Sequence, residues 1–130
     1  MSIELLTVVI CALLCLALPL FYSAIYARQV GFSTISGNRD SVPEPQGMAG
    51  RALRAHRNLI ENLVPYAAVV LVAHAIGVSN SVTAGAAMVF LGARVVHALS
   101  YIAGIVGLRT VAWNVGVAAT VVIGVQVLMR

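Results

Sequence analysis

Residues 51–77 read RALRAHRNLIENLVPYAAVVLVAHAIG, a stretch whose first part is polar and whose second part is almost wholly apolar. It is longer than the about 20 residues that a helix needs to cross a bilayer. Its first eleven positions nevertheless carry six polar or charged side chains: Arg51, Arg54, His56, Arg57, Asn58 and Glu61. Each ionisable group inside a membrane costs about 2.5–3.5 kcal/mol on insertion scales. The stretch therefore predicts a membrane helix that carries a functional site.

The rest of the sequence has the composition of an integral membrane protein. Of its 130 residues 61% are hydrophobic and 9% are charged, whereas soluble domains carry about 25% charged residues. The mean hydropathy is +0.99. Three more apolar stretches, about 3–27, 82–103 and 111–129, approach the length of a membrane-spanning helix, as residues 52–77 do. We expect an all-α, four-helix transmembrane bundle that occupies residues 1–130 as one domain, with a long loop over 28–50.

Arginines gather near that loop and predict the orientation of the bundle. Every basic side chain except histidine is an arginine, and those near the loop are Arg28, Arg39, Arg51, Arg54 and Arg57. Arg109 lies in the last connection, which four-helix topology places on the same side of the membrane. The positive-inside rule puts this side in the cytoplasm and both termini outside, although Arg130 opposes that assignment.

The polar side chains of the second helix share one face. At 100° per residue, an arc of roughly 120° contains Arg51, Arg54, Arg57, Asn58 and Glu61, whereas His56 points away from it. The third helix carries a shorter polar stripe of Arg94, His97 and Tyr101, and Arg109 and Thr110 open the fourth. We expect these groups to converge near the cytoplasmic end of the bundle.

This set of side chains suits a small zwitterion with more than one carboxylate, and glutathione has that make-up. Arginines bind carboxylates through charge-assisted hydrogen bonds, and Glu61 can take the ammonium group. A cation close to the thiol lowers its pKa and so generates the reactive thiolate. Arg109 is the candidate for this role because its charge is permanent. Cys11 and Cys15 are expected to be apolar fillers, and no metal site is expected.

The stretch RALRAHRN at residues 51–58, followed by Glu61 and Pro65, resembles the signature of the MAPEG family, the membrane-associated proteins in eicosanoid and glutathione metabolism. Residues 94–101 look like the third helix of microsomal prostaglandin E synthase, and the short chain is similar to bacterial-type members related to microsomal glutathione transferase. The resemblance spans nearly the whole chain. It implies a four-helix bundle that assembles as a homotrimer and binds glutathione between subunits near the cytosolic side.

The resemblance also implies roles for individual residues. Arg109 would activate the thiol, and glutathione would be held by Arg54, Arg57, Asn58, Glu61, His97, Tyr101 and Thr110. Arg28 and His56 would contribute to the site of the adjacent subunit. Asn62 stands where some eicosanoid-synthesising members have a tyrosine, and Trp113 replaces an aromatic hydroxyl. These two departures leave the electrophile open.

We therefore expect a glutathione-dependent transferase or peroxidase that acts on lipophilic electrophiles from within a membrane, with the bacterial inner membrane as its location. The alternative is a non-catalytic scaffold or lipid-binding trimer whose polar cluster holds a head group. A proton-coupled exporter is disfavoured because the first helix has a carboxylate only at its very end, Glu4. Nucleic acid is not an expected partner, since the basic residues lie at helix ends and form no soluble basic face.

Overall fold

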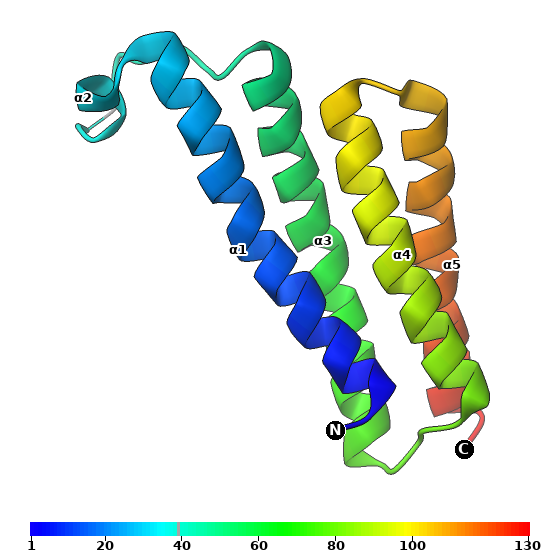
Figure 1. The fold of residues 1–130 in the computed structure, drawn as a ribbon. Coiled ribbons are helices and arrows are strands. Elements are labelled where there is room, and N and C mark those ends of the chain that lie inside the picture. Colours follow the sequence, from blue (N-terminus) through cyan, green and yellow to red (C-terminus); the bar gives the residue numbers. More distant parts are fainter. Residues whose placement is uncertain (39) are drawn as a thin grey trace.

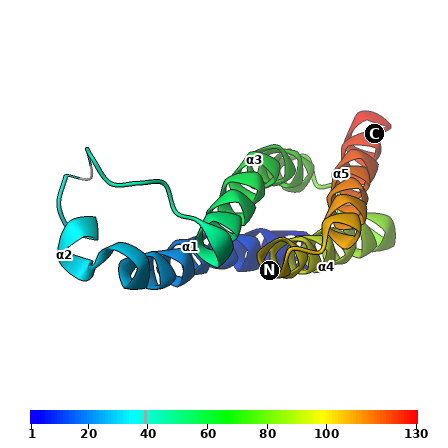
Figure 2. The same cartoon turned by 90° about the horizontal axis from the view of Figure 1, so that it is seen from above.

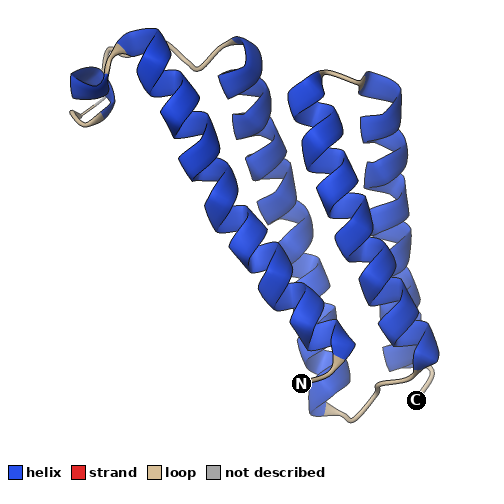
Figure 3. Ribbon diagram, viewed as in Figure 1, coloured by secondary structure: helices blue, strands red, loops and turns tan. Residues whose placement is uncertain are grey.

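The computed structural model describes residues 1–38 and 40–130, so Arg39, one of the arginines assigned to the cytoplasmic side, lies outside the described residues. The elements in chain order are α1 (Ile3–Val30), α2 (Phe32–Ile35), α3 (Gly47–Ala75), α4 (Ser81–Ala103) and α5 (Val106–Leu128). Four of them, all but α2, are long and apolar enough to cross a membrane (Figure 1). Figure 3 shows only helices and loops in the described part of the chain. The expected all-α membrane bundle is confirmed.

The helix bounds differ from the expected ones where glycine decides them. Gly31, with φ of 88°, ends α1 at Val30, and the short helix α2 then lies inside the expected loop. Gly104 ends α4 in the left-handed conformation with φ of 83°, which glycine adopts at no steric cost. The chain therefore reverses within Gly104 and Ile105, and α5 begins at Val106. Arg109 consequently lies inside the first turn of α5, whereas the apolar pattern predicted a fourth helix from about residue 111.

The helices form two close pairs. α1 packs along α3 and α4 packs along α5, while α4 also contacts α1 and α3. Between described residues α1 and α5 make no contact. Seen from above, α3 and α5 lie on the same side of the row formed by α1 and α4 (Figure 2).

One cluster of the hydrophobic core combines an aromatic pair with aliphatic and small residues. The rings of Tyr66 and Phe90 stack with centroids 3.6 Å apart. The other buried members of this cluster are Cys11, Val70, Ala73, Ala86, Ala87, Ala119 and Ile123. Alanine at these positions lets helix backbones approach closely, which is how helices pack in lipid.

A buried polar cluster joins three helices at the end where both termini lie (Figure 1). Glu4 is 4% exposed and accepts hydrogen bonds from Thr83 Oγ1 at 2.5 Å and Ser79 Oγ at 3.1 Å. Thr7 Oγ1 lies 2.5 Å from the Tyr66 hydroxyl and donates to the Glu4 carbonyl oxygen at 2.8 Å. Each buried polar group thus has a partner, as burial away from water demands. The opposite end of the bundle carries the long loop and the candidate site.

Candidate functional site

A pocket of about 260 Å³ lies between α3, α4 and α5 near the α4–α5 connection. Its lining residues are Asn58, His97, Tyr101, Arg109, Thr110 and Trp113. The first five are among the residues that the sequence analysis proposed for glutathione. The fold therefore brings together side chains from three helices that are far apart in the sequence.

Aromatic and cationic groups are ordered along one wall of this pocket. His97 and Tyr101 are one helical turn apart on α4, and their rings meet edge to face at 5.5 Å. The guanidinium carbon of Arg109 lies 4.4 Å from the centroid of the Tyr101 ring, a cation–π contact. Because Arg109 is in the first turn of α5, the positive end of the helix dipole adds to its charge. This corner of the pocket is suited to an anion.

Arg94 lies behind the pocket and connects its three helices. Its side chain is 1% exposed. Nη2 donates to the carbonyl oxygens of Ala112 and Trp113, each at 3.1 Å, and Nη1 donates to Asn58 Oδ1 at 3.5 Å. Helical spacing predicts Arg94 on the same stripe as His97 but gives it no role in binding. In the structure it is the residue that ties α5 and α3 to α4.

The remaining polar residues of α3 lie mostly outside this pocket. The polar face of α3 has Asn58 at one edge and Arg57 at the other. Arg54 and Glu61 are exposed between these edges and lie outside the pocket. Arg51 donates from Nε to the Ile102 carbonyl oxygen at 2.8 Å and joins the start of α3 to the end of α4. The arc predicted from the sequence is therefore one continuous polar face, of which the pocket within the chain uses one edge.

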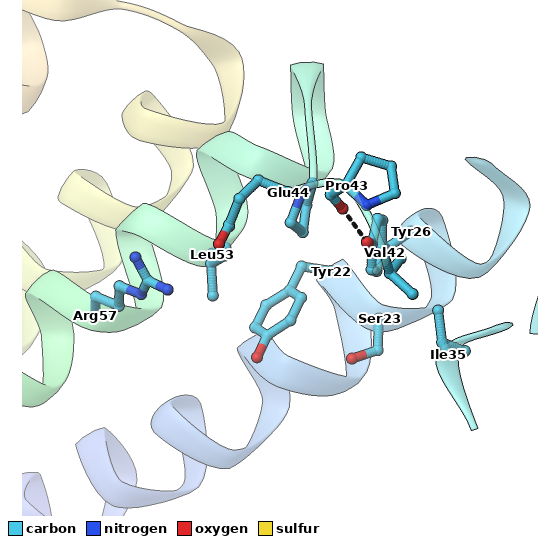
Figure 4. A pocket seen from close by; sticks show the side chains of 10 residues that line it. Tyr22, Ser23, Tyr26, Ile35, Val42, Pro43, Glu44, Leu53 and Arg57 are labelled. Carbon is cyan, nitrogen blue, oxygen red and sulfur yellow. Dashed lines mark hydrogen bonds between the residues drawn. The ribbon is translucent and has the colours of Figure 1, made fainter. Parts of the chain in front are cut away.

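Arg57, at the other edge of that face, lines a different pocket. This second pocket, also about 260 Å³, lies between α1, α3 and the loop that follows α2. Figure 4 shows Arg57 on the α3 side, with Tyr22 and Ser23 on α1 and Glu44 on the loop. The Tyr26 hydroxyl donates to the Pro43 carbonyl oxygen and fastens the loop to α1. Arg57 thus does not reach the pocket that contains Arg109 in the same chain.

Arg28 and His56 also lie on the α1 side. Arg28 is exposed in the last turn of α1. His56 is half-buried, with its ring 5.9 Å from that of Tyr22. His56 thus lies on the side of α3 against which α1 packs. Neither residue lines the pocket of its own chain, and their contribution to an adjacent subunit stays a prediction.

The charged residues of α3 do not neutralise one another. Within residues 1–38 and 40–130 no salt bridge forms, so Glu61 pairs with neither Arg54 nor Arg57. Pairing across a helix turn was the simplest structural reason for these charges to occur in a membrane helix. Its absence leaves both signs of charge available to a ligand or to another polypeptide.

The family model for the MAPEG family matches residues 6–129. The chain belongs to the MAPEG family. Comparisons with curated proteins and with solved structures give no match. This MAPEG protein is thus a multi-pass membrane protein of a family associated with glutathione, and its pocket contains Asn58, His97 and Tyr101 from the stretches that carry the resemblance.

Two residues at or next to the pocket lie one helical turn after a predicted ligand residue. Trp113 follows Thr110 by three residues, a spacing that places both on one helix face. Asn62 follows Asn58 by four residues and donates from Nδ2 to the Asn58 carbonyl oxygen at 2.8 Å and to Asn58 Oδ1 at 3.3 Å. Helical spacing thus predicts both residues beside predicted ligands, although Asn62 stands above only as a departure from other members of the family.

Proposed function

We propose that this MAPEG protein is a membrane-bound, glutathione-dependent transferase or peroxidase that acts on lipophilic electrophiles. The observation that carries the proposal is the position of Arg109, a permanent cation 4.4 Å from the Tyr101 ring in a pocket of convergent polar groups. No carboxylate of the described residues neutralises it. A bound thiolate would supply the negative charge that pairs with Arg109.

Glutathione would use the pocket and the exposed face of α3 together. Arg54 would bind a carboxylate and Glu61 the ammonium group, both through charge-assisted hydrogen bonds. Asn58, His97, Tyr101 and Thr110 offer polar groups at the pocket itself. Holding the tripeptide at several points would place its sulfur beside Arg109, and positioning of this kind accounts for much of enzymatic rate enhancement.

The chemistry requires little more of the protein than a stabilised thiolate. In conjugation, the thiol proton leaves, the sulfur attacks the electrophilic carbon, and a carbon–sulfur bond forms as a leaving group departs or the adjacent atom is protonated. In peroxide reduction, the oxygen–oxygen bond breaks, and a second glutathione completes the reaction to give the disulfide, an alcohol and water. Arg109 would stabilise the negative charge on sulfur in both reactions.

The proposed assembly is a homotrimer that binds glutathione between subunits. Arg54, Arg57 and Glu61 are exposed in the isolated chain although α3 is one of the candidate spans, and charged groups facing lipid are costly. A neighbouring copy would cover this face. Arg28 and His56, which do not line the pocket of their own chain, would then meet the glutathione of the adjacent subunit.

The location that we propose is the inner membrane of a bacterium, with both termini outside and the pocket near the cytoplasmic face. Both termini lie at the same end of the bundle, opposite the loop after α2 (Figure 1). The arginines at the loop end, Arg28, Arg51, Arg54, Arg57 and Arg109, support this orientation.

The test is glutathione binding by the purified protein in detergent, with the thiolate absorbance difference as a second readout. We expect the wild type to bind and to show thiolate absorbance. Arg54→Ala is expected to weaken binding by about 10-fold or more, the size of one charged hydrogen bond. Arg109→Ala is expected to lose the thiolate signal while some binding persists.

Arg130→Ala is the matched control, because it removes an exposed arginine at the other end of the bundle. Conjugation and peroxide assays with lipophilic substrates then separate the two activities. A wild type that neither binds glutathione nor shows thiolate would sink the catalytic proposal. Co-purified anionic lipid without thiol turnover would favour a lipid-binding trimer instead.

A further inference from the structure

The Asn58 carboxamide at the edge of the pocket has only one chemically sensible orientation. Its oxygen Oδ1 accepts hydrogen bonds from Arg94 Nη1 at 3.5 Å and from Asn62 Nδ2 at 3.3 Å. A guanidinium group has donors and no acceptor. If the carboxamide were turned over, its NH₂ group would face the arginine donor to donor, with no acceptor between them. The oxygen must therefore point toward Arg94.

The Asn58 amino group is consequently left for a ligand. Within residues 1–38 and 40–130, Asn58 Nδ2 donates to no atom, and Asn58 lines the pocket. We infer that Arg94 and Asn62 are positioning residues that hold the Asn58 carboxamide so that its amino group is offered to the ligand. The ligand must then present an acceptor at this point, a carboxylate or a peptide carbonyl oxygen. The inference rests on the proposed function insofar as glutathione supplies that acceptor.

Arg94 is itself held against α5 through one end of its guanidinium group, while its buried Nε has no hydrogen-bond partner among the described residues. Its Nη2 bonds to the carbonyl oxygens of Ala112 and Trp113 on α5. The guanidinium group lies against Gly116, where a Cβ atom would be 2.2 Å from Nη2. Only a residue without a side chain leaves room for it. The Asn58 oxygen therefore already accepts a hydrogen bond from a packed guanidinium group in the absence of ligand. Such preorganisation lowers the conformational entropy that is lost on binding.

This arrangement also discriminates between the ends of a zwitterion. An ammonium group would meet the Asn58 amino group as donor against donor, so it is excluded here and directed to Glu61. A carboxylate or carbonyl oxygen is accepted. A binding site discriminates strongly between ligands when the wrong ligand group leaves a polar group of the site unpaired or opposed by a like group.

The experiment compares Asn58→Asp with Asn58→Ala. The two variants separate the role of the Asn58 oxygen, which accepts from Arg94 and Asn62, from the role of the amino group that is offered to the ligand. Aspartate keeps an acceptor for Arg94 and Asn62 but replaces the outward donor by a second acceptor. We expect Asn58→Asp to weaken glutathione binding at least as much as Asn58→Ala, by about 10- to 100-fold. We also expect it to unfold in detergent at a temperature no lower than that of Asn58→Ala. Asn80→Asp is the charge-matched control, since Asn80 caps α4 at the far end and aspartate caps helices equally well.

A third variant, Asn62→Leu, tests positioning without touching the ligand. It is expected to raise the KM for glutathione several-fold with little change in kcat, a split that general destabilisation would not produce. An Asn58→Asp protein that binds glutathione as tightly as the wild type, or that unfolds below Asn58→Ala, would overturn the inference. If the wild type binds no glutathione the proposed function fails, while an Asn58→Asp protein that unfolds below Asn58→Ala would separately show that position 58 presents no acceptor to Arg94.

Discussion

Arg109 combines a permanent charge with a planar group stacked on an aromatic ring, and the two properties can be separated. Arg109→Lys retains the charge but loses the flat contact with Tyr101, 4.4 Å from the guanidinium carbon. Lysine is a flexible point charge and does not replace arginine at a stacked site. We expect kcat/KM with glutathione to fall by about 10-fold, less than the about 100-fold or greater fall expected for alanine from the loss of an oxyanion-type donor. Lysine and alanine variants with equal activity would argue against a role for the charge.

Gly116 is the position at which the packing of Arg94 is most easily tested. An alanine there would place its Cβ 2.2 Å from Arg94 Nη2, so the guanidinium group or α5 must shift. Overpacking of this kind costs about 1–3 kcal/mol. Gly116→Ala is therefore expected to lower the unfolding temperature in detergent and to weaken glutathione binding.

Gly92→Ala on α4 is the control for that substitution, because nothing lies within 4 Å of its added Cβ. Alanine in a helix interior is about 0.5–1 kcal/mol better than glycine when space allows, so Gly92→Ala should leave the protein as stable as the wild type or more so. If both variants behave alike, the close contact between Gly116 and Arg94 does not exist.

At the scale of elements, the Glu4 cluster holds the start of α1 against the start of α4. Thr83 donates to Glu4 Oε1 at 2.5 Å and also forms a capping box with Asn80. Thr83→Val removes the bond to Glu4 and the side-chain half of the capping box, and it leaves the Ser79 hydroxyl, at 3.1 Å, as a donor to the buried carboxylate. The loss of a charged hydrogen bond and of part of a helix cap predicts a destabilisation of about 2–3 kcal/mol.

Thermal unfolding in detergent measures this effect, and Thr120→Val is the matched control. The Thr120 hydroxyl donates at 3.1 Å to the Gly116 carbonyl oxygen in its own helix and joins no second element. Its loss should change stability by less than Thr83→Val. Equal effects would mean that the Glu4 cluster is not a significant contact between α1 and α4.

At the scale of the whole molecule, the proposed interfacial site predicts complementation between inactive variants. Arg28→Ala removes a group proposed to act on the adjacent subunit, and Arg109→Ala removes one from the pocket itself. In mixed assemblies some sites combine an intact Arg28 with an intact Arg109. Coexpression is expected to restore part of the glutathione-dependent activity that each variant lacks alone.

The control pairs Arg109→Ala with His97→Ala, because both side chains line the pocket of one chain and no mixed site contains both. Restoration in this control, or none with Arg28→Ala, would contradict a site shared between subunits.

The proposed orientation is open to a direct test with impermeant maleimides on intact cells, after Cys11 and Cys15 are replaced by alanine. A cysteine at position 130 should react from outside, whereas one at position 41 should react only after the membrane is permeabilised. Both positions are exposed. The reverse pattern would place the pocket on the outer side.

Sequence alone determined the class of fold and predicted five of the six residues that line the pocket. Runs of apolar residues long enough for a bilayer leave few alternatives to helices, because only helices and closed barrels satisfy every backbone group in lipid. Helical periodicity likewise predicted that Arg51, Arg54, Arg57, Asn58 and Glu61 share one face. These features are local, so the order of residues suffices to read them.

Tertiary structure decided which edge of that face each residue occupies. Asn58 meets Arg94 while Arg57 lies beside Tyr22, because α4 packs against one side of α3 and α1 against the other. The tight turn at Gly104 brought Arg109 into the first turn of α5. Gly116 left room for the buried guanidinium group of Arg94, a contact that helical periodicity does not predict. Contacts between helices depend on the shapes of facing side chains, and residues far apart in the sequence meet only when the bundle has formed.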